Sequence, residues 1–253
     1  MHLDVIDLKK FYYRTKLGLV TKNLLQESVQ RIWEDCSSEQ LAGFGFVPPL
    51  MQPFLNFSNT IFCLMPSQQG VMAWPTGSKN CTMLVEEVSW PLRSGSVDRL
   101  IVSHGLETCD NPNDLLKEIW RVLRPSGRVI FTVPNRAGLW ARSDLTPFGY
   151  GRPYSLTQLE QQLRVNRFET LGFTGALYSP PSHRSYFLKT MRFWERLGRR
   201  LDSRVIAGAL VVEATKLIYA TQKPSLKKVV SVPLEVIEEF TKPKPKPISR
   251  DKI

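Results

Sequence analysis

Short apolar runs alternate with amphipathic or turn-forming stretches along most of this sequence. Within residues 8–35, apolar residues recur at helical spacing and predict one or two amphipathic helices. The later runs are rich in β-branched residues and are bounded by turn-forming residues, which is typical of buried strands. They read LAGFGFV, NTIFCLM, CTMLVEEV, SVDRLIVSH, GRVIFTVP, FETLGFTGALY and IAGALVVEATKLIYAT.

Helical patterns lie between several of these runs, most clearly in NPNDLLKEIWRVL and YSLTQLEQQLRVN. Asn111 or Asn113 is expected to cap the first of these helices, and Ser155 or Thr157 the second. Buried strands that alternate with helices predict an α/β protein with a doubly wound sheet. The last two runs are expected to pair antiparallel around the segment between them.

The net charge of +11 is concentrated in two parts of the chain. Residues 184–204 hold seven Lys/Arg against two Asp/Glu, and residues 223–253 hold eight against four. A nucleic-acid binder more often spreads its basic residues over a folded face, so this pattern argues against a nucleic-acid partner. The C-terminal part alternates Lys with Pro, which predicts an extended or disordered tail.

The sequence predicts a cytoplasmic protein without a bound metal. No apolar run approaches the roughly 18 residues that span a bilayer, and the N-terminus lacks the basic-then-apolar order of a signal peptide. Cys36, Cys63, Cys81 and Cys109 lie far apart, as expected for thiols in a reducing compartment.

Residues 90–140 carry a series of motifs in a characteristic order. They are Trp90-Pro91-Leu92, Val97-Asp98, His104-Gly105-Leu106-Glu107 and Arg121-Val122-Leu123-Arg124-Pro125-Ser126-Gly127. This order resembles class I S-adenosylmethionine-dependent methyltransferases, closest to the branch that includes quinone-biosynthesis methyltransferases. The resemblance implies a Rossmann-like seven-stranded sheet, mostly parallel with an antiparallel last strand, and S-adenosyl-L-methionine as the cofactor.

The resemblance also divides the chain. It implies an N-terminal helical segment (1–37), a methyltransferase-like domain (38–222) with an acceptor-side insertion (180–204), and a basic Lys/Pro tail (223–253).

The resemblance places the cofactor beyond the carboxyl ends of the strands, where Gly43 and Gly45 close the first one. Gly45 matches the first glycine of the family's loop, but Val47 and Pro49 stand where two more glycines are expected. Pro49 lacks an N–H group, so this degenerate loop is expected to offer the cofactor fewer hydrogen bonds. Gly45→Val is expected to abolish cofactor binding while the chain stays folded.

The ends of the next strands supply further candidate cofactor contacts. Family members carry an acid after strand two, where this chain has Ser67 and Gln68. Either side chain could bind a ribose hydroxyl, or the segment is a plain turn. Glu86 aligns with the acid that contacts the adenine amino group, and Glu87 with its neighbour, although a solvated acid is the alternative for each. Ser103 and His104, at the end of strand four, complete the set.

His104 is also the candidate catalytic residue. The resemblance places the methyl group of the cofactor at the end of strand four, and an imidazole titrates near neutral pH, which suits a general base. A structural histidine is the alternative interpretation.

The segment after strand five supplies the candidate acceptor-binding residues Asn135, Arg136, Trp140 and Arg152. Arg136 and Arg152 could hold an anionic acceptor through bidentate hydrogen bonds. A loop that only closes a pocket would show the same composition.

Within the insertion, an apolar stripe runs along one side of a predicted basic helix. It consists of Phe187, Met191, Trp194, Leu197 and Leu201. Packing in the core is one interpretation, and contact with an anionic membrane is the other.

These features together favour methyl transfer from S-adenosylmethionine to a small-molecule or lipid-like acceptor. The alternative is a methyltransferase-fold protein without catalytic activity that acts as a binding or scaffold module, which the degenerate loop favours. A nucleic-acid methyltransferase is a weaker third hypothesis, because no Asn/Asp-Pro-Pro-Tyr/Phe-like motif follows strand four.

Overall fold

The computed structural model describes residues 3–34, 36, 39–58, 60–200 and 206–218. Residues 1–218 form one compact unit, and the predicted Lys/Pro tail lies outside the described residues. No described helix is long and apolar enough to cross a bilayer. The helices are α1 (Val5–Arg14), α2 (Lys16–Ile32), α3 (Pro48–Met51), α4 (Pro112–Val122), α5 (Leu156–Val165) and α6 (Ser185–Arg200), with short 3-10 turns at Gln52–Phe54, Trp140–Arg142 and Pro147–Gly149. The strands are β1 (Gln40–Gly45), β2 (Thr60–Pro66), β3 (Thr82–Val85), β4 (Val97–Ser103), β5 (Leu123–Pro134), β6 (Phe168–Ala176) and β7 (Ala209–Lys216).

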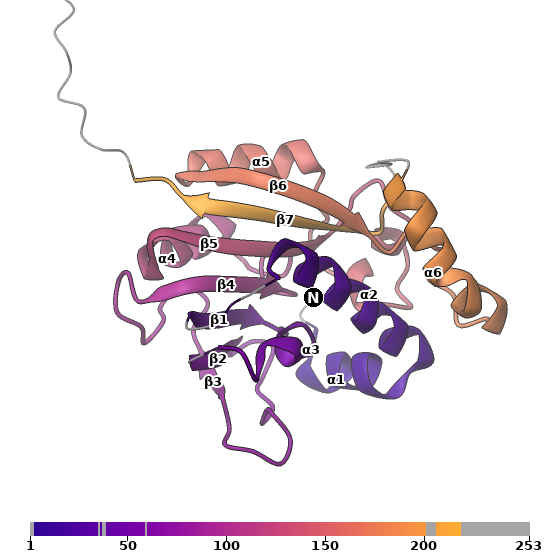
Figure 1. Cartoon of the computed structure of the whole chain (residues 1–253), viewed down its shortest axis with the longest axis horizontal. Helices are drawn as coiled ribbons and strands as arrows, with labels where there is room; N and C mark the ends of the chain where they lie inside the picture. Colours follow the sequence, from indigo (N-terminus) through magenta and orange to yellow (C-terminus); the bar gives the residue numbers. More distant parts are fainter. Residues whose placement is uncertain (1–2, 35, 37–38, 59, 201–205, 219–253) are drawn as a thin grey trace, which may run out of the picture. The chain divides into compact units, whose positions relative to one another are not determined.

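Within the described ranges, seven strands form one sheet in the order β3-β2-β1-β4-β5-β7-β6 (Figure 1). Neighbouring strands from β3 to β5 are parallel, whereas β7 pairs antiparallel with both β5 and β6. This confirms the predicted fold, including the antiparallel last strand. The strand order reverses between β1 and β4, and an open α/β sheet binds its ligands beyond the carboxyl ends at such a point.

Alternate residues of the central strands face opposite sides of the sheet, so each strand contributes to two cores. Leu41 and Ile101 pack among apolar residues of α1 and α2. Phe44 and Val102 pack among apolar residues of α4 and α5. Helices therefore cover both faces (Figure 1), which explains why the strand sequences are apolar along nearly their whole length.

Thr15 divides the predicted N-terminal helical region into two helices. Its N–H donates to the Phe11 carbonyl where α1 ends, and its hydroxyl oxygen accepts from the Gly18 N–H at 3.0 Å where α2 begins. The start of α1 is attached to the sheet, because the Val5 N–H donates to the carbonyl of Gln69, just after β2, at 2.8 Å. This places α1 at the carboxyl edge of the strands.

The predicted apolar stripe of α6 is divided between the core and the surface. Met191 is 1% exposed and belongs to the core, whereas Trp194 is 40% and Leu197 36% exposed. Leu201 lies outside the described residues. Core packing alone therefore does not account for the composition of this helix.

Candidate active site

The predicted cofactor-binding residues lie along one edge of the sheet, because the parallel strands β1 to β4 all end there. The register places Gly45 opposite Ser103 and Pro66 opposite Val85. Ser67 follows β2 directly, and its N–H donates to the Val85 carbonyl at 2.9 Å. The ends of four strands thus bring these positions into one row.

The two glycines of β1 allow close packing at this edge. Gly45 has a φ of 86°, and a Cβ atom there would overlap the carbonyl oxygen of Ser103. A Cβ atom on Gly43 would overlap the side chains of Val47 and Met51. The fold itself therefore needs both glycines. The expectation that Gly45→Val leaves the chain folded is wrong, because a side chain at this position collides with the end of β4.

The backbone N–H groups after β1 are largely used within the loop itself. The Val47 N–H donates to the Gly45 carbonyl at 3.1 Å, and the N–H groups of Leu50 and Met51 donate to the Val47 carbonyl. Pro48 and Pro49, which begin α3, have no N–H group. Few donors remain in this loop for a ligand carboxylate.

Glu86 and Glu87 follow β3 but differ in their surroundings. The Glu86 side chain is exposed at the edge. The Glu87 carboxylate accepts from the Asp110 N–H at 3.3 Å and lies 3.2 Å from the Cys109 sulfur. Glu87 thus fixes the segment after β4, whereas Glu86 is open to a ligand.

His104 sits in an enclosed, conformationally constrained position directly after β4. It is 1% exposed and has a φ of 51°, a left-handed conformation that is uncommon outside glycine. Its Nε2 atom lies 2.7 Å from the Tyr12 hydroxyl of α1, and the Phe148 ring meets the imidazole edge-to-face at 5.0 Å. Burial, and then the charge of Glu107, raises the pKa of Tyr12 well above its usual value, so this hydroxyl keeps its proton at neutral pH.

Several buried acceptor atoms around His104 have no hydrogen-bond partner. Both carboxylate oxygens of Glu107 and the Oε1 atom of Gln69 belong to this group. Glu107 Oε1 lies 3.2 Å from His104 Nδ1, close enough for charge interaction but poorly aligned for a hydrogen bond. Gln69 donates through Nε2 to the His104 carbonyl at 2.9 Å. A buried acceptor without a hydrogen bond destabilises the folded protein. A ligand with hydrogen-bond donors or a positive charge would therefore bind favourably at this edge.

The four predicted acceptor-binding residues separate into two kinds. Asn135 donates to the Ala207 carbonyl at 2.7 Å, and Trp140 donates to the Ser179 carbonyl at 2.7 Å. Both are buried and hold the loop after β5 in place. Arg136 and Arg152 have exposed side chains, and Arg136 Nη2 donates to the Pro153 carbonyl at 3.3 Å.

Sequence reasoning missed three residues of this edge: Tyr12, Gln69 and Glu107. Glu107 lay within a quoted motif but was assigned no role, and Gln69 lay one residue beyond the pair considered after strand two. Tyr12 had no local signal, since it lies outside the predicted domain and 92 residues from His104.

A groove of about 280 Å³ separates α1 from the loop between β5 and α5. Phe11 of α1 and Pro147 of the loop line it. Their neighbours in sequence, Tyr12 and Phe148, are the residues that contact His104. The groove is therefore formed by the same two segments that cover His104.

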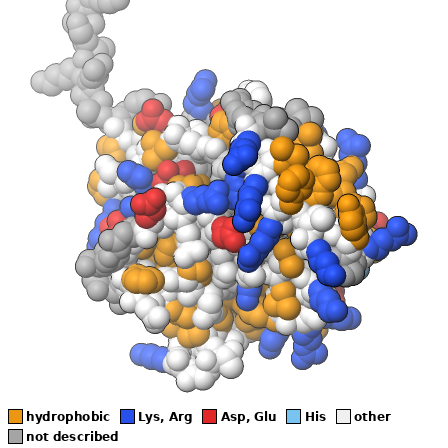
Figure 2. Space-filling view, turned by 45° about the vertical axis from the view of Figure 1, so that its right-hand side comes forward, with side chains coloured by type: hydrophobic (Ala, Val, Ile, Leu, Met, Phe, Trp, Pro, Cys, Tyr) orange, Lys and Arg blue, Asp and Glu red, His pale blue; other side chains and the backbone are white. Residues whose placement is uncertain are grey.

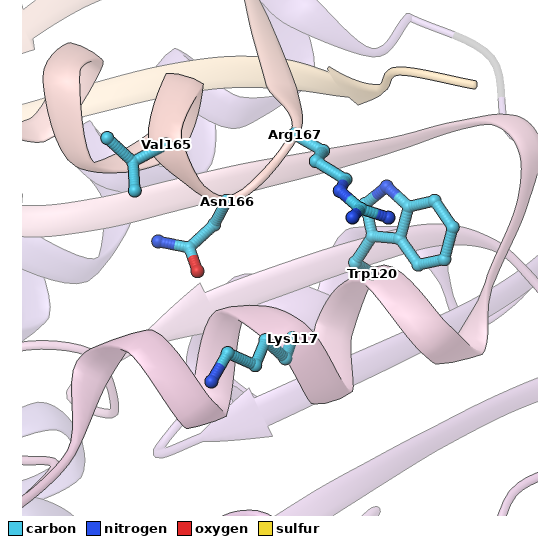
Figure 3. Close-up of a pocket in the computed structure, with 5 residues that line it drawn as sticks. All are labelled: Lys117, Trp120, Val165, Asn166 and Arg167. Atoms are coloured by element: carbon cyan, nitrogen blue, oxygen red, sulfur yellow. The ribbon is translucent and has the colours of Figure 1, made fainter. Parts of the chain in front are cut away.

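Another pocket, of about 350 Å³, opens between α4 and the end of α5 (Figure 3). Lys117 and Trp120 of α4 face Val165, Asn166 and Arg167, and the Arg167 guanidinium lies 5.7 Å from the centre of the Trp120 ring. None of the predicted site residues lines this pocket, so it is separate from the carboxyl edge.

Residues 42–131 match a family model described as a methyltransferase domain. Similar solved structures include S-adenosylmethionine-dependent methyltransferases from Thermotoga maritima (TM-score 0.57, 16% identity, covering 84% of this chain and 96% of that one) and Archaeoglobus fulgidus (TM-score 0.57, 14% identity, 84% and 100%). The [4+2]-cyclase SpnF is also similar (TM-score 0.52, 19% identity, 78% and 80%). At these identities the structures show a shared fold. A comparison with curated proteins found no match.

Residues 42–131 thus match a methyltransferase domain, and the described sheet has the fold of S-adenosylmethionine-dependent methyltransferases. The domain match and the shared fold support an enzyme that transfers methyl groups, with S-adenosyl-L-methionine as its cofactor. The comparisons do not identify its acceptor.

The residues at the carboxyl edge fit this cofactor with a reduced set of hydrogen bonds. S-Adenosylmethionine carries two cationic groups, an ammonium and a sulfonium, and the unpaired buried oxygens of Gln69 and Glu107 are suited to positive charge. Its carboxylate finds fewer backbone donors, because those after Gly45 are used within the loop. Among the described residues, no group of three or more His, Cys, Asp or Glu side chains could hold a metal ion.

Proposed function

We propose that the chain transfers a methyl group from S-adenosylmethionine to a small-molecule or lipid-like acceptor at the carboxyl edge beneath α1. The observation that carries this proposal is the enclosure of His104 by Tyr12 and Phe148 at the centre of that edge. Methyl transfer from a sulfonium is an in-line displacement, whose rate depends on positioning and on the exclusion of water. An enclosed edge supports both.

In this proposal, the cofactor lies across the ends of β1 to β4. Glu86 accepts a hydrogen bond from the adenine amino group, and Ser67 binds a ribose hydroxyl. Gly45 lets β1 approach the Ser103 carbonyl closely, and Gly43, Gly45 and Ser103 would line the cofactor site. The quinone-biosynthesis branch stays a prediction from the sequence motifs.

His104 is the group that would receive a proton if the acceptor must lose one. Nε2 is the receiving atom, and the Tyr12 hydroxyl lies beside it at 2.7 Å. The Glu107 carboxylate, 3.2 Å from Nδ1, would stabilise the imidazolium that forms.

Arg136 and Arg152 are the proposed acceptor contacts, since both are exposed near the loop that covers His104. Asn135 and Trp140 would affect the acceptor only indirectly, by holding that loop in position.

Peripheral contact with an anionic membrane would bring a lipid-like acceptor to the protein. A cytoplasmic location remains a prediction from the sequence.

A methyltransferase-fold protein without catalytic activity is the second candidate function. One observation favours it: the Tyr12 hydroxyl already occupies His104 Nε2, and α1 lies where a ligand would have to enter. A binding module of this kind would not need the cofactor, so cofactor affinity separates the two candidates.

His104→Asn is expected to lower the rate of methyl transfer by about 10²- to 10⁴-fold if His104 acts as the base. Asparagine tolerates the left-handed conformation at this position, so the fold should be retained. The measurement follows labelled methyl groups from S-adenosylmethionine into the organic and aqueous fractions of a cell extract. If the unaltered chain labels neither fraction, the proposed methyl transfer is contradicted. If the two proteins transfer methyl groups at equal rates, the role of His104 as the base is contradicted.

A further inference from the structure

Helix α6 packs one side against the compact unit and turns a wide face outwards. Met191 and Glu195 are 1% exposed, and Gly198 lies directly against the Tyr178 ring. The helix contacts α2 and β6. The outer face begins beyond these contacts and contains most of the charged and aromatic residues of the helix.

Half of the outer face is apolar. Tyr186 is 71% exposed and Phe193 62%, and the partly exposed Trp194 and Leu197 lie beside them. Residues at this spacing share one side of a helix, so they form a single patch. Exposed apolar residues that gather in this way mark an interaction surface.

The other half of the outer face is basic. Lys189, Arg192, Arg196 and Arg200 have exposed side chains. The acid of this helix, Glu195, is buried and therefore does not offset them at the surface. Figure 2, which brings the side carrying α6 forward, shows apolar side chains next to Lys and Arg side chains.

Arginines from α6 and α2 line a pocket of about 140 Å³. They are Arg31, Arg192, Arg196 and Arg199, with Leu24 and Glu27 completing the lining. The lining thus contains four guanidinium groups and one carboxylate, so the pocket carries a net positive charge.

The two acids at this pocket, Glu27 and Glu195, both lie beside Arg199. Glu27 lies 4.0 Å from Arg199 Nη2 and is 40% exposed at its side chain. Glu195 lies 3.7 Å from the same guanidinium, at Nη1, and burial raises the pKa of its carboxyl. The Arg199 Nη1 atom is buried without a hydrogen-bond partner. A phosphate group would supply acceptors for these donors.

We propose that α6 docks the protein on an anionic phospholipid membrane, with the aromatic patch in the interface and a lipid phosphate in the arginine pocket. A basic helix with one aromatic side meets the requirements for lying in the headgroup region of a bilayer. A nucleic acid or a phosphopeptide would use the arginines but would leave the exposed aromatic patch without a role. This proposal rests on the proposed function in one respect: docking on a membrane would bring a lipid-like acceptor to the active site.

The experiment measures sedimentation of the full chain with vesicles of phosphatidylcholine, alone or mixed with phosphatidylserine. Binding to the mixed vesicles is expected to be at least about tenfold stronger, since each basic residue near an anionic surface adds attraction. Raising the salt to about 1 M should release the protein, because the Debye length falls to about 3 Å. Inorganic phosphate at millimolar concentration should weaken binding only slightly if the site needs a membrane.

Two variants and a matched control locate the surface. Arg192→Glu with Arg196→Glu, and separately Phe193→Ala with Trp194→Ala, should each reduce vesicle binding by at least tenfold. Lys79→Glu with Arg93→Glu changes the net charge by the same amount at exposed positions away from α6 and should leave binding nearly unchanged. The melting temperature and the affinity for S-adenosylmethionine of each variant report whether the fold is retained.

Docking would be overturned if the full chain bound no vesicles at low salt, or bound both vesicle types equally. It would also be overturned if the charge variant and its control lost binding equally, or if the chain bound inorganic phosphate but no vesicles. Vesicle binding that depends on α6 in a protein that transfers no methyl group would support docking while the proposed reaction fails. Loss of vesicle binding with unchanged cofactor affinity in the α6 variants would support docking as a property distinct from the reaction.

Discussion

Replacing Gly45 with alanine is expected to destabilise the chain by about 2–5 kcal/mol, the combined cost of a left-handed conformation and of overpacking. The glycine has a φ of 86°, and an added Cβ atom would overlap the backbone carbonyl of Ser103. A backbone oxygen inside the sheet cannot move aside as a flexible side chain can. Urea unfolding followed by circular dichroism measures the loss.

Gly77→Ala is the matched control for this variant. Gly77 has a φ of 80°, but a Cβ atom there would meet nothing within 4 Å. Its substitution should therefore cost only the conformational part, about 1–2 kcal/mol. Equal losses in the two variants would show that β1 and β4 do not approach each other as closely as described.

Trp140→Ala is expected to cost about 3–5 kcal/mol of stability, as for other buried tryptophans. The indole is 1% exposed, donates to the Ser179 carbonyl and meets the Phe148 ring at 5.6 Å. Phe148 in turn covers His104, so the loop over the candidate active site should loosen as well. Thermal and urea unfolding both report this change.

Trp194→Ala serves as the control, because Trp194 is 40% exposed on α6 and should change stability by less than about 1 kcal/mol. Trp140→Ala could instead lose no more stability than this control and only weaken acceptor binding. Trp140 would then be an acceptor contact, and the structural role inferred from its burial would be contradicted.

The sequence predicted those features that depend on local patterns. The alternation of apolar strands and helices predicted a doubly wound sheet whose last two strands pair antiparallel, and the polar residues before two helices predicted their caps. Asn111 caps α4, and Ser155 caps α5 with a reciprocal bond to Gln158. Such signals lie within a few residues of the feature they determine, so they can be read from one sequence.

Contacts between distant segments could not be predicted in the same way. The hydrogen bond from Tyr12 to His104 joins α1 to the end of β4, and no local pattern indicates that an N-terminal helix lies over the site. The collision at Gly45 depends on the register between β1 and β4, which is a property of the folded sheet. Similarly, the outward position of Trp194 depends on which side of α6 meets α2.

Calorimetric titration of the full chain with S-adenosylmethionine and S-adenosylhomocysteine tests the central claim most directly. We expect dissociation constants between micromolar and sub-millimolar, roughly −8 to −5 kcal/mol, because acceptors such as Gln69 and Glu107 are present but backbone donors after Gly45 are few. The absence of binding by either compound at millimolar concentration would contradict the enzyme assignment and leave a binding module without catalytic activity.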